Sequence, residues 1–281
     1  MNIEEAKKLI VNGGGQQFFI PSFNKKLLFK EYTTGMQKVL SKTIVSNDQY
    51  VSDMTRLGLF DNMLLEGTHE YKSGQLTIID MIAFISQIKK SVIGSNNFKF
   101  DMRCGCGSDI KITIDLDKII ERCKNYEFKH LIFKCDLSEK QYEFELKDAS
   151  WMDLIILRES LKKTYDKFDG SDAQFQFYFI LNKICMYIKS IKINNDEVKN
   201  KNEQSFDKWT VPERIKFFDL LNPKITIDDN NNDSLLNIIT KNFSDRQISE
   251  YIFNNSFINK KCDSCGENVE SVFTYDNFFQ L

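Results

Sequence analysis

The sequence predicts an α+β protein in which helices flank a small antiparallel sheet and four cysteines join a middle hairpin to the C-terminus. Apolar residues recur at three- and four-residue steps in the first third of the chain and again in its second half, which is the period of helices. Between these parts, apolar and polar residues alternate with period two, which indicates strands. Cysteines gather beside glycines at only two places, in the middle and near the end.

Residues 1–95 are predicted to contain a strand pair followed by helices. The stretch 18–35 has the pattern of a hairpin, and Pro21 places its first strand at an edge, because proline cannot donate a ladder hydrogen bond. Apolar residues at helical steps then predict helices over 36–46 and over about 47–65.

The helix predicted over 76–94 has the clearest boundary signals of this part. Thr77 with Asp80 can form a capping-box-like start, and Gly94 can supply the left-handed residue that ends a helix. Asp80 lies inside an apolar stretch, and capping explains its presence there without a catalytic role.

Residues 96–148 are predicted to form the antiparallel sheet and to carry the first cysteine turn. Two strands joined by the tight turn CGCGS come first, then a short helix, then a second strand pair. The predicted strands cover 97–104, 109–116, 128–135 and 140–147.

Residues 149–258 are predicted to be helical, and 259–281 are predicted to hold the second cysteine turn and a strand that returns to the sheet. The stretch 173–191 is apolar over most of its surface and predicts a central helix. The four regions are expected to form one compact unit. Helix starts are predicted at Ser150 with Asp153, Ser171 with Gln174, Thr210 with Glu213, and Ser244 with Gln247.

The two cysteine turns can together supply four thiolates. Glycine lets the backbone fold around a metal and leaves amides free to bond to the sulfurs. If the turns face each other, they make a four-thiolate tetrahedron, which predicts a zinc-ribbon-like element with a structural Zn2+ that pins the C-terminus onto the early hairpin. The predicted ligands are Cys104, Cys106, Cys262 and Cys265.

Two other interpretations of these cysteines stay open, a redox Cys-x-x-Cys pair and ordinary thiols. The redox pair is disfavoured because 262–265 lacks the preceding strand of a βαβ unit and the helix N-terminus that would lower a thiol pKa. A catalytic zinc is disfavoured because four protein thiolates leave no open position for water. The single cysteines Cys123, Cys135 and Cys185 lie in apolar contexts and are predicted to be core residues.

The chain contains no recognisable catalytic constellation. His69 lies in a polar loop and His130 in a strand, and neither has a partner pattern for acid–base or metal chemistry, so both are predicted to be surface residues. The glycines at 13–15 lack the Gly-Lys-Ser/Thr that a phosphate loop needs. The sequence therefore predicts a protein that is not an enzyme and has no small-molecule substrate.

Composition argues against an electrostatic partner. The formal net charge is −2, so there is no global field for nucleic acid or an anionic membrane, and the short cluster Lys89-Lys90 is interpreted as a solvated face. No stretch has the roughly 18 apolar residues that span a bilayer, and the N-terminus lacks a signal-peptide pattern, so a reducing cytosol is expected. The alternative is a zinc-ribbon nucleic-acid-binding or transcription-related module, since NFKFDMR (97–103) interleaves aromatic and basic residues.

Several segments of the chain follow one another in a distinctive order. After the early IPS, they are LTIIDMIAFISQIKKSVIGS (76–95), CGCGSDIKITIDLDKI (104–119), KICMYIKSIKINNDEV (183–198), PERIKFFDLL (212–221) and KCDSCGENVESVFTYDNFFQL (261–281). This order resembles the baseplate hub and hub-assembly protein family of T-even-type contractile-tailed bacteriophages, and the similarity extends from about residue 19 to the end. The resemblance implies a structural late protein of the virion tail baseplate, or one that acts in the host cytoplasm during tail assembly, with other baseplate and tail proteins as partners.

Overall fold

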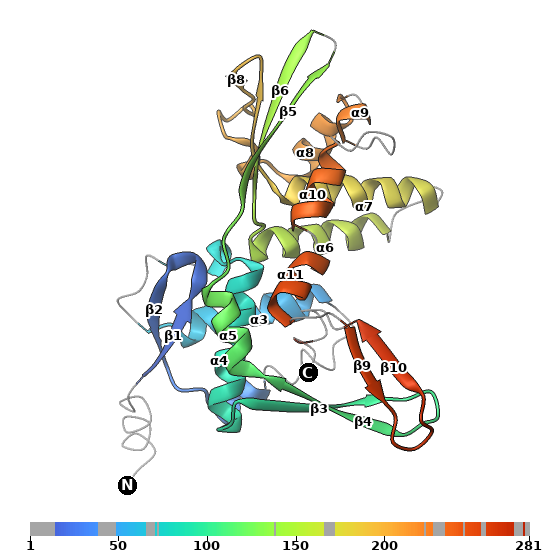
Figure 1. Cartoon of the computed structure of the whole chain (residues 1–281). Helices are drawn as coiled ribbons and strands as arrows, with labels where there is room; N and C mark the ends of the chain where they lie inside the picture. The colour runs from blue at the N-terminus through green and yellow to red at the C-terminus, as the bar shows by residue number, and fades with distance from the viewer. Residues whose placement is uncertain are drawn as a thin grey trace. The chain divides into compact units, whose positions relative to one another are not determined.

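The computed structural model shows an α+β chain whose helices and small antiparallel sheets divide between two compact units (Figure 1). Unit 1 contains residues 1–126 and 248–281, and unit 2 contains 127–247. The predicted α+β class is confirmed, but the prediction of one compact unit is wrong. The strands predicted as one sheet over 96–148 belong to two different units, because the second strand pair forms a sheet with later strands instead of with the first pair. The structure describes residues 15–38, 49–65, 71, 73–137, 139–165, 172–221, 223–226, 234–243, 245–253, 257–272 and 278.

The first described elements of unit 1 form the predicted hairpin. Strand β1 (Gln16–Ile20) pairs antiparallel with β2 (Lys25–Phe29), and Pro21 opens the 3-10 turn η1 (Pro21–Phe23) between them. Pro21 thus lies just after the strand and not within it as predicted, because its fixed φ suits the first position of a turn. The predicted helix over 36–46 falls largely outside the described residues.

Two helices cover this hairpin with an aromatic core. They are α3 (Gln49–Met63) and α4 (Ile78–Ile93), and the 3-10 turn η2 (Ser73–Gln75) comes between them in the chain. Edge-on and tilted rings pack at centroid distances of 5.1–6.0 Å, the range in which aromatic pairs attract. The rings are those of Phe18, Phe29, Phe60 and Phe84.

The predicted ends of α4 are confirmed. Thr77 and Asp80 form a capping box, and Gly94 ends the helix with φ 64° and a hydrogen bond to the carbonyl of Lys90. Asp80 also accepts hydrogen bonds from the amide (2.8 Å) and hydroxyl (2.6 Å) of Ser22. Burial raises the pKa of Asp80, and the hydrogen bonds from Ser22 and Thr77 oppose that rise. The carboxylate therefore joins the hairpin turn to the helix start.

Two glycine-to-alanine substitutions in unit 1 should change stability in opposite directions. Gly94→Ala is expected to cost about 1–2 kcal/mol, because an L-residue is strained at positive φ. Gly58→Ala inside α3 is the matched control and should stabilise by about 0.5–1 kcal/mol, since nothing lies within 4 Å of the added Cβ. Urea denaturation of the two variants measures both; equal effects would contradict this account.

The remaining elements of unit 1 bring the middle and the end of the chain together. Strands β3 (Asn97–Arg103) and β4 (Asp109–Asp115) form one antiparallel hairpin, followed by α5 (Leu116–Lys124). After α11 (Asp245–Phe253), β9 (Phe257–Lys261) and β10 (Asn268–Val272) form another hairpin, which lies beside the first (Figure 1). The prediction that the last strand returns to the sheet is wrong, because β10 pairs with β9.

Unit 2 is built around a four-stranded antiparallel sheet in the order β5-β6-β7-β8. The predicted strands correspond to β5 (His130–Leu137) and β6 (Lys140–Lys147), but β7 (Ile188–Ile193) and β8 (Asp196–Glu197) lie in the region predicted to be helical. Ile188 and Ile191 of β7 are buried, on either side of an irregularity in the pairing with β6, and this tertiary pairing overrides continuation of the helix. The helices of this unit are α6 (Trp151–Tyr165), α7 (Asp172–Met186), α8 (Val211–Phe218), α9 (Pro223–Thr226) and α10 (Leu235–Phe243), with the 3-10 turn η3 (Phe206–Lys208).

The helix starts of unit 2 follow their predicted caps where the structure describes them. Ser150 and Asp153 exchange hydrogen bonds between side chains and amides at 3.0 and 3.1 Å. The Glu213 carboxylate accepts from the amide (2.9 Å) and the hydroxyl (2.8 Å) of Thr210. The other two predicted starts involve Ser171 and Ser244, which lie outside the described residues.

One face of the sheet in unit 2 carries charged side chains paired across the strands. Glu145 on β6 accepts from Lys189 Nζ (2.8 Å) and Ser190 Oγ (2.6 Å), and His130 Nε2 lies 2.5 Å from its Oε1. These contacts, that of Lys189 foremost, lower the pKa of Glu145 from 4.5 to about 2.

Glu145 should therefore stabilise unit 2 in a pH-dependent way. Since its pKa is lower in the folded state, its contribution is full above pH 4.5 and is lost as the pH falls toward 2. The difference in unfolding free energy between the wild type and Glu145→Gln should shrink across that interval. Urea denaturation at several pH values measures it, and a constant difference would contradict the assigned ionisation.

Candidate metal centre

The first cysteine turn closes the hairpin of β3 and β4. The amide of Cys104 donates to the carbonyl of Ser108 (2.8 Å). This hydrogen bond extends the pairing of β3 with β4 by one position beyond the pair Arg103–Asp109. The amide of Gly107 donates back to the carbonyl of Cys104 (2.9 Å). Gly107 has φ 90°, a conformation in which glycine carries no steric penalty, so the chain folds back tightly around the sulfurs.

The second turn repeats this arrangement with one more residue. The amide of Cys262 donates to the carbonyl of Glu267 (2.8 Å), and the amide of Gly266 donates to the carbonyl of Cys262 (2.9 Å). Gly266 has φ 76°. The shared pattern explains why Cys-x-Cys and Cys-x-x-Cys, each followed by glycine, present two thiols from equivalent hairpin tips.

The tips bring all four predicted ligands together. Cys104 Sγ lies 3.6 Å from Cys265 Sγ, Cys106 Sγ lies 3.7 Å from Cys262 Sγ, and the four sulfurs lie within 4.8 Å of one another. A tetrahedral zinc with Zn–S bonds near 2.3 Å requires S···S distances of about 3.8 Å. A disulfide would need about 2.05 Å. The four thiols therefore have the spacing of ligands around one metal ion.

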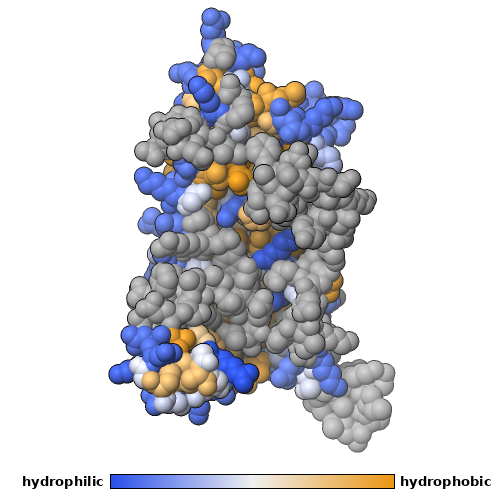
Figure 2. All heavy atoms as spheres, turned by 90° about the vertical axis from the view of Figure 1, so that its right-hand side faces the viewer, coloured by the Kyte–Doolittle hydropathy of each residue, from blue (hydrophilic) through white to orange (hydrophobic). Residues whose placement is uncertain are grey.

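The cluster has a buried side and an exposed side. Cys104 and Cys262 are 4% and 2% exposed, whereas Cys106 and Cys265 face solvent. Beneath the buried pair lies a small hydrophobic core shared by the two hairpins. Its members are Ile110 and Ile112, with Phe100, Met102, Ile114 and Val269 packed against them. In Figure 2 the hairpin tips face the viewer near the bottom, where a small hydrophobic patch is bordered by hydrophilic residues.

The thiols differ in acidity. Hydrogen bonds from the hydroxyl and amide of Ser108 lower the pKa of Cys106 to about 6. For Cys265, a hydrogen bond from the amide of Glu267 lowers the pKa, but the partial desolvation caused by the cluster and the neighbouring thiols outweigh it and raise the pKa to about 12. Four adjacent sulfurs cannot all ionise against one another, and a bound divalent cation removes that obstacle because it favours every thiolate.

Phe278 is held at the start of β3, the end of that strand away from the cysteine turn. Phe278 is fully buried and lies 6.5 Å from the ring of Phe98 and 5.6 Å from that of Phe253, measured between centroids. Lys89 Nζ lies over Phe98 and Phe278, at 4.2 and 5.1 Å from the ring centroids. Burial, with the nearby charge of Arg56, lowers the pKa of Lys89 to about 8. The interpretation of Lys89 as part of a solvated face is therefore wrong, because its ammonium group lies over two aromatic rings and is largely removed from water.

The other residues considered from the sequence do not join the cluster. Cys123 and Cys185 are buried as predicted, and burial raises the pKa of both thiols. Cys135 is only half-buried on β5, so the prediction of a core position is not met in full. His130 is exposed as predicted and pairs with Glu145, and His69 lies outside the described residues.

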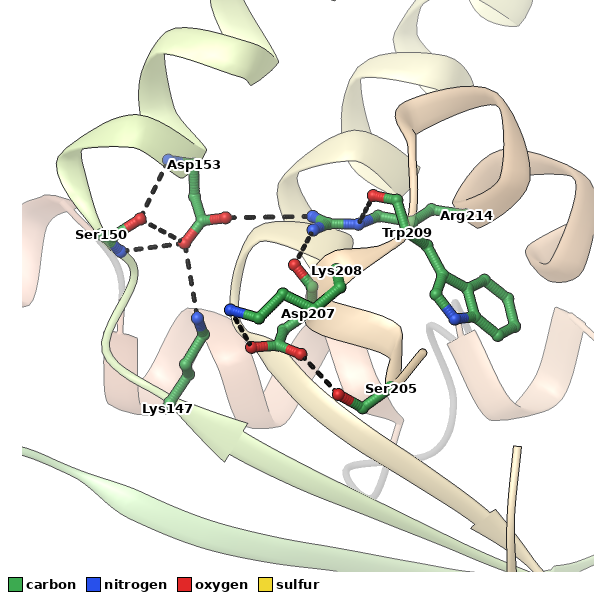
Figure 3. Close-up of polar contacts among 8 residues, drawn as sticks. All are labelled: Lys147, Ser150, Asp153, Ser205, Asp207, Lys208, Trp209 and Arg214. Carbon is green, nitrogen blue, oxygen red and sulfur yellow. Dashed lines mark hydrogen bonds and ion pairs between the residues drawn. The ribbon is translucent and has the colours of Figure 1, made fainter. Parts of the chain in front are cut away.

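A second polar cluster, which the sequence did not reveal, is structural (Figure 3). Arg214 is 6% exposed and donates to the carbonyls of Trp209 (3.1 Å) and Asp207 (2.8 Å). Its Nη1 lies 4.0 Å from the carboxylate of Asp153, which Lys147 also approaches at 3.6 Å. The guanidinium of Arg214 donates to backbone carbonyls just before α8 and lies near the Asp153 carboxylate that caps α6. Arg214 therefore fixes the segment before α8 to the start of α6.

Comparison of the chain with protein families, curated proteins and solved structures finds no match. Among the described residues, none of the helices combines the length and the apolar character of a bilayer-spanning segment. The fold and site define an α+β protein with a paired-hairpin cluster of four cysteines that could bind a metal ion.

Proposed function

We propose that the four cysteines bind one structural zinc ion, which joins the hairpin β3–β4 to the hairpin β9–β10. The observation that carries this proposal is the S···S spacing of 3.6–3.7 Å between the hairpins, close to the edge of a zinc–thiolate tetrahedron. Tetrahedral sulfur sites favour zinc or iron among the common metals. Four protein ligands complete the coordination, so the ion would stabilise the fold and not activate a water molecule.

The role proposed for the whole protein is structural. It is a component of a phage tail baseplate hub, or an assembly factor for it, and it acts by contact with other tail proteins in the virion or in the host cytoplasm. The support is the order of the segments 76–95, 104–119, 183–198, 212–221 and 261–281, together with a site whose ligands are all supplied by the protein.

A zinc-ribbon nucleic-acid module is the second candidate, since paired cysteine hairpins resemble such ribbons. The charge of the two hairpins argues against this candidate. The segments 97–115 and 257–272 together carry five basic and six acidic residues, whereas nucleic-acid binding surfaces are strongly basic. The hairpins thus lack the excess of positive charge that phosphate contacts require.

Co-purification tests the structural role. In phage-infected cells, the tagged wild-type chain should recover baseplate proteins, and deletion of its gene should abolish hub assembly. Cys265→Ser is the variant that tests whether the metal site is needed, with Cys135→Ser as its control. Intact tails from the deletion strain would refute the role. Binding to DNA that weakens steeply as salt rises, without recovery of tail proteins, would favour the nucleic-acid module.

A further inference from the structure

Two short sulfur–sulfur distances in the cluster join different hairpins. Cys104 on the first tip is 3.6 Å from Cys265 on the second, and Cys106 is 3.7 Å from Cys262. In both pairs an approach of about 1.6 Å would bring the sulfurs to disulfide bonding distance. Both distances cross the junction, so disulfides at these two close pairs need only a small approach of the hairpins.

Each close pair contains one exposed and one buried sulfur. Cys265 and Cys106 are exposed, and their respective partners Cys104 and Cys262 are buried. The space beside the first tip is also open, because a Cβ added at Gly105 or at Gly107 would meet nothing within 4 Å. A small oxidant in solution can therefore reach the exposed sulfur of each pair. The buried sulfur on the opposite hairpin then lies close enough to react with the oxidised one.

We propose that this cluster is an oxidation-sensitive modification site. A peroxide converts its thiolates into two disulfides, Cys104–Cys265 and Cys106–Cys262, and the metal ion is released. The proposal extends the zinc site described above and depends on the same four sulfurs. The two hairpins would then be joined by a metal ion under reducing conditions and by disulfide bonds under oxidising conditions.

The chemistry requires one peroxide for each disulfide. An exposed sulfur attacks the peroxide, an S–O bond forms, the O–O bond breaks, and the leaving hydroxide takes a proton to become water. The buried sulfur of the other hairpin then attacks the sulfenic sulfur, the S–S bond forms, and the S–O bond breaks with loss of a second water. Two thiols lose two electrons and the peroxide gains two. Sulfurs joined in disulfides carry no negative charge, so the thiolate ligands that held the cation no longer exist.

Disulfides within one turn are the competing products. Cys104 and Cys106 are separated by one residue, so their ring would be small and would depart from the geometry that a disulfide prefers. Cys262 and Cys265 are separated by two residues, the spacing at which Cys-x-x-Cys pairs do form disulfides, so this bond is the main competitor. Bonds within a turn would leave the two hairpins without a covalent or metal link, whereas the crossed pairs keep them covalently joined.

Peptide mapping of the full-length protein distinguishes these products. The protein is treated with about two equivalents of hydrogen peroxide, enough for two disulfides. Remaining thiols are blocked with N-ethylmaleimide, and the chain is cut before aspartate with Asp-N protease. Cys262 then lies on peptide 245–262, Cys265 on 263–275, and both other cysteines on 101–108. The crossed bonds should link 101–108 to both of the other peptides, and fragmentation at Gly105 should assign Cys104 to Cys265.

Several results would overturn the proposal. They are a direct link between 245–262 and 263–275, the opposite assignment across Gly105, and sulfinic acids in place of disulfides. Released zinc is measured in the same samples with a colorimetric chelator. Crossed disulfides in a protein that never contained zinc would support the oxidation site and refute the zinc proposal. Zinc release without crossed disulfides would support the zinc proposal and refute the oxidation site.

Discussion

Cys265→Ser is expected to remove most of the bound zinc and to lower the unfolding free energy of unit 1 by about 4 kcal/mol or more. Loss of a structural metal is among the few single changes with effects of this size, because metal binding contributes directly to folding. Cys265 is exposed, so exchange of sulfur for oxygen removes little hydrophobic burial. The loss of stability therefore reports the metal and not a core defect.

Zinc content by mass spectrometry and thermal unfolding measure this prediction together. Cys135→Ser is the matched control, since that thiol is partly exposed on β5 and lies outside the cluster. Cys135→Ser should keep its zinc and most of its stability. Adding a chelator to the wild type should reproduce the Cys265→Ser result. If Cys265→Ser retains both zinc and stability, the metal does not join the hairpins.

Arg56→Leu is expected to destabilise unit 1 by about 3–5 kcal/mol. Arg56 and Asp53 are 1% and 0% exposed and form an ion pair at 2.9 Å inside α3. Removal of the arginine takes away a cation that is paired with a buried carboxylate, and the lost compensation carries a cost of this size. Chemical denaturation of the purified variant gives the value.

A double variant separates the charge effect from loss of packing. In Asp53→Leu/Arg56→Leu both charges disappear, so the penalty should be much smaller than in Arg56→Leu alone. The exposed pair Glu159–Lys163 on α6 provides a surface comparison, and Lys163→Ala should cost only about 0.3–0.5 kcal/mol. A double variant as unstable as the single one would show that packing, and not charge compensation, dominates at this position.

The metal cluster could be predicted from sequence because its signal is local. Each pair of cysteines lies in a turn whose glycine permits the positive φ that the fold requires, at Gly107 and at Gly266. Capping pairs such as Thr77 with Asp80 are local in the same way, since three residues contain the donors and the acceptors.

Features that depend on tertiary pairing could not be predicted from the sequence. The stretch around β7 continues an apolar helix pattern, and only the neighbouring β6 explains why Ile188 begins a strand. The buried pair of Asp53 and Arg56 resembles an ordinary surface pair at helical spacing. The division into two units is equally hidden, because it depends on which strands pair and not on any composition change.

The central claim is that Cys104, Cys106, Cys262 and Cys265 together hold one zinc ion. X-ray absorption spectroscopy at the zinc edge tests it most directly, on the wild-type protein purified under reducing conditions without added metal. The expected result is one zinc per chain, bound by four sulfurs at about 2.3 Å. A folded protein without metal, or a zinc with nitrogen or oxygen ligands in place of sulfur, would contradict it.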